Sequence, residues 1–271
     1  MTFQPVVAGS GLAGWAFLQS TMQRQTEVFN KSPNLARDSD YFTQNIGAVR
    51  TADDLVSDRR LLRVALGAFG LQDDIDSRAF IRKILEEGTR DDGALANRLT
   101  DSRYKKLAEA FGFDRLTGPR TAQTGFSGEI VGLYRRRSFE VVVGQQDQAL
   151  RLGLNAMREL PEIARSDQSE NAKWFTIMGT QPLRQVFETV LGLPTGFGKL
   201  DLDRQLAIFK DRADRQLGIG KLEELADPAA VEKLVERFLL MDQVKSFGAQ
   251  SSNAIALTLL QSVRPLRFDG L

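Results

Sequence analysis

Apolar residues recur along most of this chain at the spacing of an α-helix, not at the alternation of a strand. In residues 61–69 they fall on one broad helical face: Leu61, Leu62, Ala65, Leu66 and Phe69. The same pattern returns in residues 80–85, 104–111 and 231–239. These periods predict an all-α, multihelical fold.

Polar residues and glycines indicate where these helices begin and end. Thr51–Asp54 has the spacing of a capping box before the helix of residues 61–69, with Asp in place of the usual Glu. Asp101 or Ser102 can cap the helix that follows, and Gly88 is suited to stop a helix. Asp227 and Pro228 combine an N-cap acid with a proline in the first turn.

One stretch has the composition of a buried strand. Residues 139–143, Phe-Glu-Val-Val-Val, are rich in β-branched side chains. Over residues 132–160, however, the apolar positions are spaced as on a helix, and no turn signal interrupts residues 145–148. We therefore predict a helix here, and expect residues 126–173 to form one long linking helix.

Residues 9–14, Gly-Ser-Gly-Leu-Ala-Gly, have the G-x-G-x-x-G spelling of a dinucleotide-binding turn. That turn needs a strand before it, a helix after it, and a second strand with an acid about 20 residues further on. Residues 6–8 are short for a central strand, and residues 30–40 are polar and contain Pro33. We interpret Gly9 to Gly14 as a flexible entry into a first helix, with Gly14 allowing a close approach. A nucleotide-dependent enzyme that uses this turn is the alternative.

Three short segments recur in the same order, which indicates an internal duplication. The matches are Tyr41–Thr43 with Trp174–Thr176, Leu61–Leu71 with Leu183–Leu193, and Tyr104–Phe111 with Val231–Phe238. We therefore expect two pseudo-repeated helical modules joined by a long central helix. The expected segments are an N-terminal arm and first helix (1–36), helical repeat 1 (37–125), a linking helix (126–173), helical repeat 2 (174–240), and a C-terminal helix and tail (241–271).

The chain contains no histidine and no cysteine. Thiolate nucleophiles, Ser-His-Asp triads, the usual zinc ligand sets and disulfides are therefore excluded.

The charges of the chain are nearly balanced. Lys and Arg number 36 against 35 Asp and Glu, so no net charge favours nucleic acid or an anionic membrane. No apolar run is long enough to cross a membrane, and the first ten residues lack the basic region of a cleaved signal peptide. We expect a non-enzymatic protein with no cofactor, no metal, no nucleic-acid partner and no membrane insertion.

Two stretches have a familiar wording: residues 41–71, YFTQNIGAVRTADDLVSDRRLLRVALGAFGL, and residues 78–88, RAFIRKILEEG. Both resemble DUF1217, a largely alphaproteobacterial family of unknown function. The resemblance covers roughly residues 37–240 and rests on hydrophobic and turn patterns. It implies a multihelical fold in which the module occurs more than once, and it carries over no catalytic residue. Because genes of this family often lie among flagellar genes, it also implies a flagellar association.

Three charged stretches have ordinary structural interpretations. Arg135–Arg137 can bind an anion or an acidic partner, but the balanced charge of the chain favours a solvated helix face. Residues 201–215 alternate charges around an apolar stripe, with Asp211 and Arg215 four residues apart, which predicts a surface helix. The acids of residues 73–76 lack the glycine and the closing glutamate of a calcium loop, so we expect a polar loop.

The two ends of the chain are apolar although they lie outside the repeats. They either pack on the repeats or bind a partner, and both interpretations stay open at this point. Flagellar axial proteins co-assemble through apolar helical ends, so the resemblance favours a helical interaction or assembly protein whose partners are flagellar components. It would lie in the cytoplasm or be exported to the flagellum without a cleaved signal peptide. The candidate partner-binding residues are Trp15, Leu18, Met22, Leu259, Leu266 and Phe268.

Overall fold

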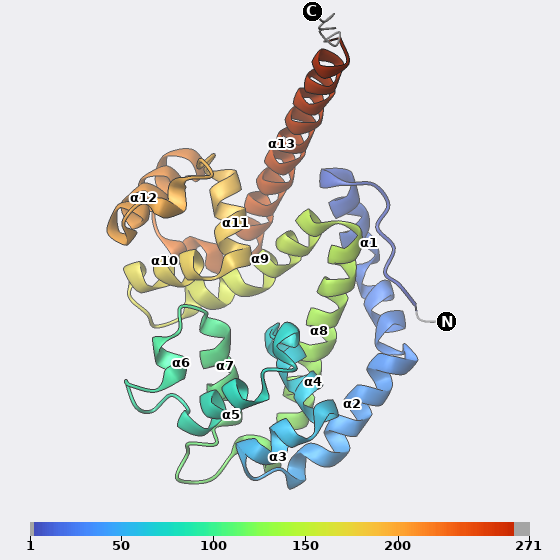
Figure 1. Ribbon diagram of the computed structural model, residues 1–271, viewed down its shortest axis with the longest axis vertical. Coiled ribbons are helices and arrows are strands. Elements are labelled where there is room, and N and C mark those ends of the chain that lie inside the picture. The colour runs from blue at the N-terminus through green and yellow to red at the C-terminus, as the bar shows by residue number, and fades with distance from the viewer. Residues whose placement is uncertain (1–2, 263–271) are drawn as a thin grey trace, which may run out of the picture.

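The computed structural model describes the backbone of residues 3–262 and the side chains of residues 3–247. Within residues 3–262 the chain forms thirteen α-helices and no strand, which confirms the all-α, multihelical prediction (Figure 1). The α-helices are α1 (Gly11–Asn30), α2 (Pro33–Asn45), α3 (Ala52–Ser57), α4 (Arg59–Phe69), α5 (Arg78–Glu87), α6 (Leu95–Arg98), α7 (Ser102–Phe111), α8 (Phe126–Gln146), α9 (Gln148–Arg165), α10 (Glu170–Gly179), α11 (Gln181–Val190), α12 (Leu202–Leu217) and α13 (Pro228–Ser262). Short 3₁₀ helices are η1 (Ile46–Ala48), η2 (Gln72–Asp74), η3 (Arg120–Ala122), η4 (Phe197–Lys199) and η5 (Leu222–Ala226).

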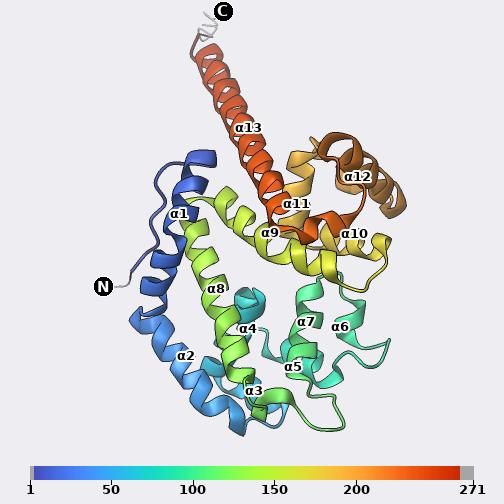
Figure 2. The same ribbon diagram turned by 180° about the vertical axis from the view of Figure 1, so that it is seen from behind.

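The helices form two groups that meet where α8 ends and α9 begins (Figures 1 and 2). Helix α8 runs through the first group, α2–α8, and α9 runs along the second group, α9–α13. The prediction of one linking helix over residues 126–173 is wrong, because the chain turns at Asp147 and α9 ends at Arg165. Asp147 has extended backbone angles, and its Oδ1 accepts the N–H of Leu150 at 3.1 Å. This carboxylate caps a new helix instead of continuing the old one.

Helix α4 is the centre of the first group. Eight of its eleven residues are buried, because α2, α7 and α8 surround it. Gly67 allows α8 to come close, since a methyl group there would lie 2.7 Å from the ring of Tyr134. The sequence pattern showed one apolar face, and the surrounding helices bury the flanks as well.

An aromatic cluster fills the second group. The Trp174 ring of α10 lies 5.6 Å from Phe187 of α11 and 6.3 Å from Phe209 of α12, both in edge-on arrangements. Such edge-on pairs stabilise the fold beyond what burial of the rings already contributes. The three helices therefore share one apolar centre, and α13 packs against α9 and α11 beside it.

Most predicted helix ends are confirmed. Asp101 caps α7, Gly88 ends α5, and Asp227 with Pro228 begins α13. Thr51 and its partner Asp54 form a capping box, but they cap the short α3, while α4 has its own cap at Asp58. The charged stretch of residues 201–215 is a helix, with Arg215 and Asp211 paired at 2.7 Å.

The matched segments of the expected repeat end in the same way. Leu71 donates its N–H to Leu66 O at 2.9 Å after Gly70, whose φ is +73°. Leu193 donates its N–H to Glu188 O at 2.9 Å after Gly192, whose φ is +59°. This is the Schellman arrangement at a helix C-terminus. The equivalence of the two whole modules, and the five-segment division, stay predictions.

The glycine motif lies at the start of α1 and has no strand beside it within residues 3–262. Gly9 and Gly11 have φ of +86° and +57°, and a methyl group at Gly14 would lie 2.6 Å from Gly9 O. The entry into a helix and the close approach at Gly14 are therefore confirmed. The strand–turn–helix context of a dinucleotide turn is not present in this part of the chain.

The segment before α1 is held by side chains. Val6 donates its N–H to Gln25 Oε1 at 2.6 Å, and Gln25 Nε2 donates to Val6 O at 3.0 Å. Gln146 at the end of α8 accepts the N–H of Val7 and donates to Pro5 O. The expectation of a flexible entry is thus corrected, because two glutamines hold residues 5–7 against α1 and α8.

We predict that Gly14→Ala lowers the free energy of unfolding by about 1–3 kcal/mol, because the new methyl group meets a backbone carbonyl that cannot rotate away. The matched control is Gly132→Ala in the exposed middle of α8, where the new methyl group would meet no described atom within 4 Å apart from its own stretch of helix. That change should be neutral or stabilise by up to about 1 kcal/mol. Urea denaturation of both variants measures the difference, and equal stabilities would contradict the close approach at Gly14.

Candidate functional site

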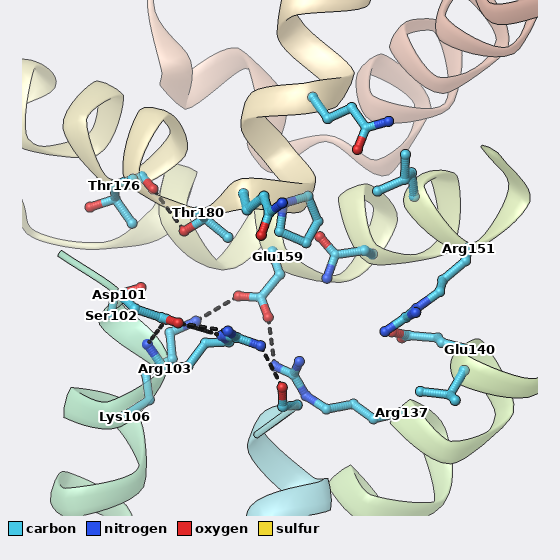
Figure 3. A pocket seen from close by; sticks show the side chains of 18 of the residues that line it. Asp101, Ser102, Arg103, Lys106, Arg137, Glu140, Arg151, Glu159, Thr176 and Thr180 are labelled. Carbon is cyan, nitrogen blue, oxygen red and sulfur yellow. Dashed lines mark hydrogen bonds and ion pairs between the residues drawn. The ribbon is translucent and has the colours of Figure 1, made fainter. Parts of the chain in front are cut away.

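A polar cavity of about 480 Å³ lies between the two helix groups. Its walls come from the ends of α4 and α10, the first turns of α7 and α11, and the facing sides of α8 and α9 (Figure 3). Charged and amide side chains line it: Asp101, Arg103, Lys106, Arg137, Glu140, Arg151, Asn155 and Glu159.

A cluster of ion pairs forms the floor of this cavity. Glu140 of α8 accepts from Arg158 Nε at 2.8 Å and from Arg158 Nη2 at 2.9 Å, a bidentate pair. Glu159 accepts from Lys106 Nζ of α7 at 2.6 Å, from Arg137 Nη2 of α8 at 2.8 Å, and from the adjacent Arg158. One carboxylate therefore joins three helices.

The cluster is deeply buried, with side-chain exposures of 5% for Arg158 and 7% for Glu159. Burial alone would raise the pKa of Glu159, but the charges of Arg158, Lys106 and Arg137 outweigh it and lower that pKa to about 2. Burial and the neighbouring Arg158 lower the pKa of Arg137 despite the nearby carboxylates. Arg137 is therefore the incompletely compensated cation of the cluster.

Several polar atoms around the cavity lack partners among the described side chains. Arg137 Nε and Asn155 Oδ1 are buried and form no hydrogen bond there. The side chain of Arg151 lines the cavity and forms neither a hydrogen bond nor an ion pair with any described residue. Buried polar groups without partners are costly, so the cavity presents hydrogen-bonding capacity that the fold itself does not use.

The first turn of α11 also faces the cavity, through Gln181 and Pro182. Its N-cap, Thr180, donates its hydroxyl to Thr176 O at 2.8 Å, so no side chain caps this helix. The first N–H groups of a helix carry a partial positive charge. Together with Arg137 and Arg151, this helix end makes the cavity able to hold negative charge.

The structure places the predicted partner-binding residues in different surroundings. Trp15 and Leu18 are buried, and Met22 is partly buried against the core. Packing inside the chain therefore replaces the expected partner contact at Trp15 and Leu18, because α9 and α13 cover that face of α1. The side chain of Leu259, and all of Leu266 and Phe268, lie outside the described residues.

The prediction of a solvated face at Arg135–Arg137 holds for Arg136 but is wrong for Arg137. Arg137 points inward to Glu159, 22 residues away, and this pairing leaves no local sequence signal. A usable hint that Arg137 faces inward is the acid at Glu140, three residues on and hence on the same helical face.

Within the described residues no group of three acids could hold a metal ion, and no helix is long and apolar enough to cross a membrane.

We predict that Glu159→Gln lowers the free energy of unfolding at neutral pH by about 3–5 kcal/mol, because three cations lose their shared carboxylate. Glu162→Gln is the matched control on α9, where the carboxylate is exposed and contributes at most about 1 kcal/mol. Urea denaturation of the full chain compares the two variants. Equal, small losses would contradict the joining role of Glu159.

A comparison of wild type with Glu159→Gln also gives a prediction of how stability depends on pH. The pKa of Glu159 is lowered from 4.5 to about 2 in the folded chain, so its contribution to stability is complete above the higher value. This contribution is lost as the pH falls from 4.5 toward the folded-state pKa of about 2. The stability difference between wild type and Glu159→Gln should therefore be constant near neutral pH and shrink on acidification. A difference that does not change with pH would contradict the lowered pKa.

Comparison with known proteins places the chain in a family. The model of DUF1217, described as a protein of unknown function, matches residues 68–231. A crystal structure of a protein from Agrobacterium tumefaciens, from a structural genomics consortium, is similar at 32% identity with a TM-score of 0.73; the match covers 90% of this chain and 98% of that one. No curated protein matches. Because the family model spans more than half of the sequence, the chain belongs to the DUF1217 family.

Proposed function

We propose that this chain is a non-enzymatic helical assembly protein that binds a flagellar component through the outer part of α13. The observation that carries the proposal is the shape of that helix. Helix α13 spans 35 residues, and its second half extends away from both helix groups (Figures 1 and 2). A long helix that leaves the body offers its sides to another molecule.

The described part of this extension bears exposed apolar side chains. Leu240, Val244 and Phe247 are 49%, 65% and 62% exposed. At 100° per residue these positions fall within about 60° of one another on the helix, so they form one apolar stripe. We call these three residues the α13 stripe.

The chemistry of the α13 stripe suits the apolar face of another helix. Residues spaced by three and four are the anchors with which a helix lies in an apolar groove or beside a second helix. Family membership supports the flagellar part of the proposal, since the genes of this family often lie among flagellar genes. The partner would thus be a helical flagellar protein, met in the cytoplasm or after export without a cleaved signal peptide.

We predict that Val244→Asp abolishes the function of the chain in flagellar assembly, because a carboxylate in the centre of the α13 stripe is costly to bury against an apolar partner. The test is complementation of a gene-deletion strain, with swimming and filament number as readouts. Ser246→Asp is the matched control, since it adds the same charge to an exposed position on another side of α13. Both variants should melt at the same temperature as wild type.

Three results would overturn the proposal. A deletion strain that swims and builds normal flagella removes the flagellar role. Full complementation by Val244→Asp removes the α13 stripe as the binding surface. A stable dimer in sedimentation analysis that Val244→Asp dissociates assigns the stripe to a second copy of the chain instead of a flagellar partner.

A further inference from the structure

The charges around the cavity are matched in number but not in pairing. Five cationic side chains surround it or lie in its floor: Arg103, Lys106, Arg137, Arg151 and Arg158. Five carboxylates face them: Asp73, Asp101, Glu140, Glu159 and Glu162. Asp101 is held by Arg103 at 2.6 Å, and Glu140 and Glu159 are held by the ion pairs described above. The Arg151 guanidinium forms no ion pair with a described residue, so the fold leaves this cation of the cavity unpaired.

Hydrogen-bond donors without acceptors lie in the wall of the cavity. Arg137 Nε–H is buried without a partner, and the Arg151 guanidinium has none among the described side chains. The first turn of α11 is uncapped and adds the backbone N–H of Gln181, while Pro182 has no N–H to add. Two guanidinium groups and a helix N-terminus are what carboxylate and phosphate groups bind in proteins.

Asn155 supplies an independent observation and narrows the chemical class of the ligand further. The residue is 9% exposed, it lines the cavity, and its Oδ1 accepts no hydrogen bond from a described residue. An acceptor needs a donor, which a carboxylate or a fully ionised phosphate does not provide. The volume, about 480 Å³, is in the range of small-molecule sites and far exceeds a single oxyanion.

We propose that this cavity binds a small organic anion that also carries a hydroxyl group. Its carboxylate or phosphate lies against Arg137 and Arg151 near the first turn of α11, and its hydroxyl donates to Asn155 Oδ1. Such a ligand contacts both helix groups at once, because α8, α9 and α11 all contribute to the cavity wall. Binding would stabilise the chain by mass action.

The test is calorimetric titration of the full chain with glycerol 3-phosphate and with glycerate, which supply the phosphate and carboxylate forms of the same chemistry. Glycerol is the uncharged control, and inorganic phosphate is the control without a carbon-bound hydroxyl. We expect at least one organic anion to bind and to raise the melting temperature, with glycerol inactive and inorganic phosphate weaker. No binding of either organic anion at millimolar concentration, or equal binding of inorganic phosphate, would overturn the proposal.

Variants separate a binding role from a structural one. Arg151→Gln should weaken binding by about tenfold or more and leave the melting temperature of the free protein unchanged, since the guanidinium pairs with no described side chain and glutamine keeps the carbon atoms that lie against Gly144. Asn155→Leu should also weaken binding while the free protein melts at the same or a higher temperature, because an unpartnered acceptor is removed. Arg136→Gln, on the exposed side of α8, is the matched control and should bind as wild type does. Unchanged affinity in either Arg151→Gln or Asn155→Leu would overturn the assignment of that side chain, and unchanged affinity in both would overturn the site.

Discussion

The arrangement of the two helix groups depends on the buried carboxylate of Glu159. It meets a cation from α7, another from α8 and a third from α9. Glu159, Arg137 and Arg158 have largely left water to do so, and Lys106 has done so in part. Each ion loses several kcal/mol of hydration on burial, which is recovered only when every partner is in place. Apolar packing is non-directional, so it brings helices together without fixing their register. The charge-assisted hydrogen bonds of Glu159 supply the missing direction, and α7, α8 and α9 have one relative position as a result.

The polar cavity exists because ion pairs, and not apolar side chains, join the two helix groups. A junction filled with leucine and phenylalanine would close completely, as the aromatic cluster of α10, α11 and α12 does. A junction built from long charged side chains leaves room above the ion pairs, and it leaves donors and acceptors for which the fold has no partner. The turn at Asp147 contributes as well, because it aims α9 across the first group instead of along α8. The unpartnered polar groups of the cavity are thus a consequence of how the two helix groups are joined.

The helices were predictable from sequence because their signals are local. Residues three and four apart share a face, and a cap lies within three residues of the N–H that it binds, so α4, α7 and α12 could be located in advance. The turn at Asp147 was missed because one acidic cap among glutamines has neither the glycine nor the proline that usually marks a break. The ion cluster was missed for a different reason. Lys106 and Glu159 are 53 residues apart, and only the packed fold brings them together.

The ends of the chain show why an apolar stripe does not by itself identify a binding surface. Trp15 has helical apolar spacing in the sequence, and so do the residues of the α13 stripe. Gly153 decides the outcome for Trp15, because its missing side chain lets α1 and α13 approach α9; a methyl group there would lie 3.2 Å from the Trp15 ring and 2.9 Å from Val235. The α13 stripe lies beyond Leu239, where α13 extends past the two helix groups, so the same kind of stripe stays exposed. A surface for a partner is therefore expected where a helix extends past its neighbours, which the periodicity of that helix alone cannot reveal.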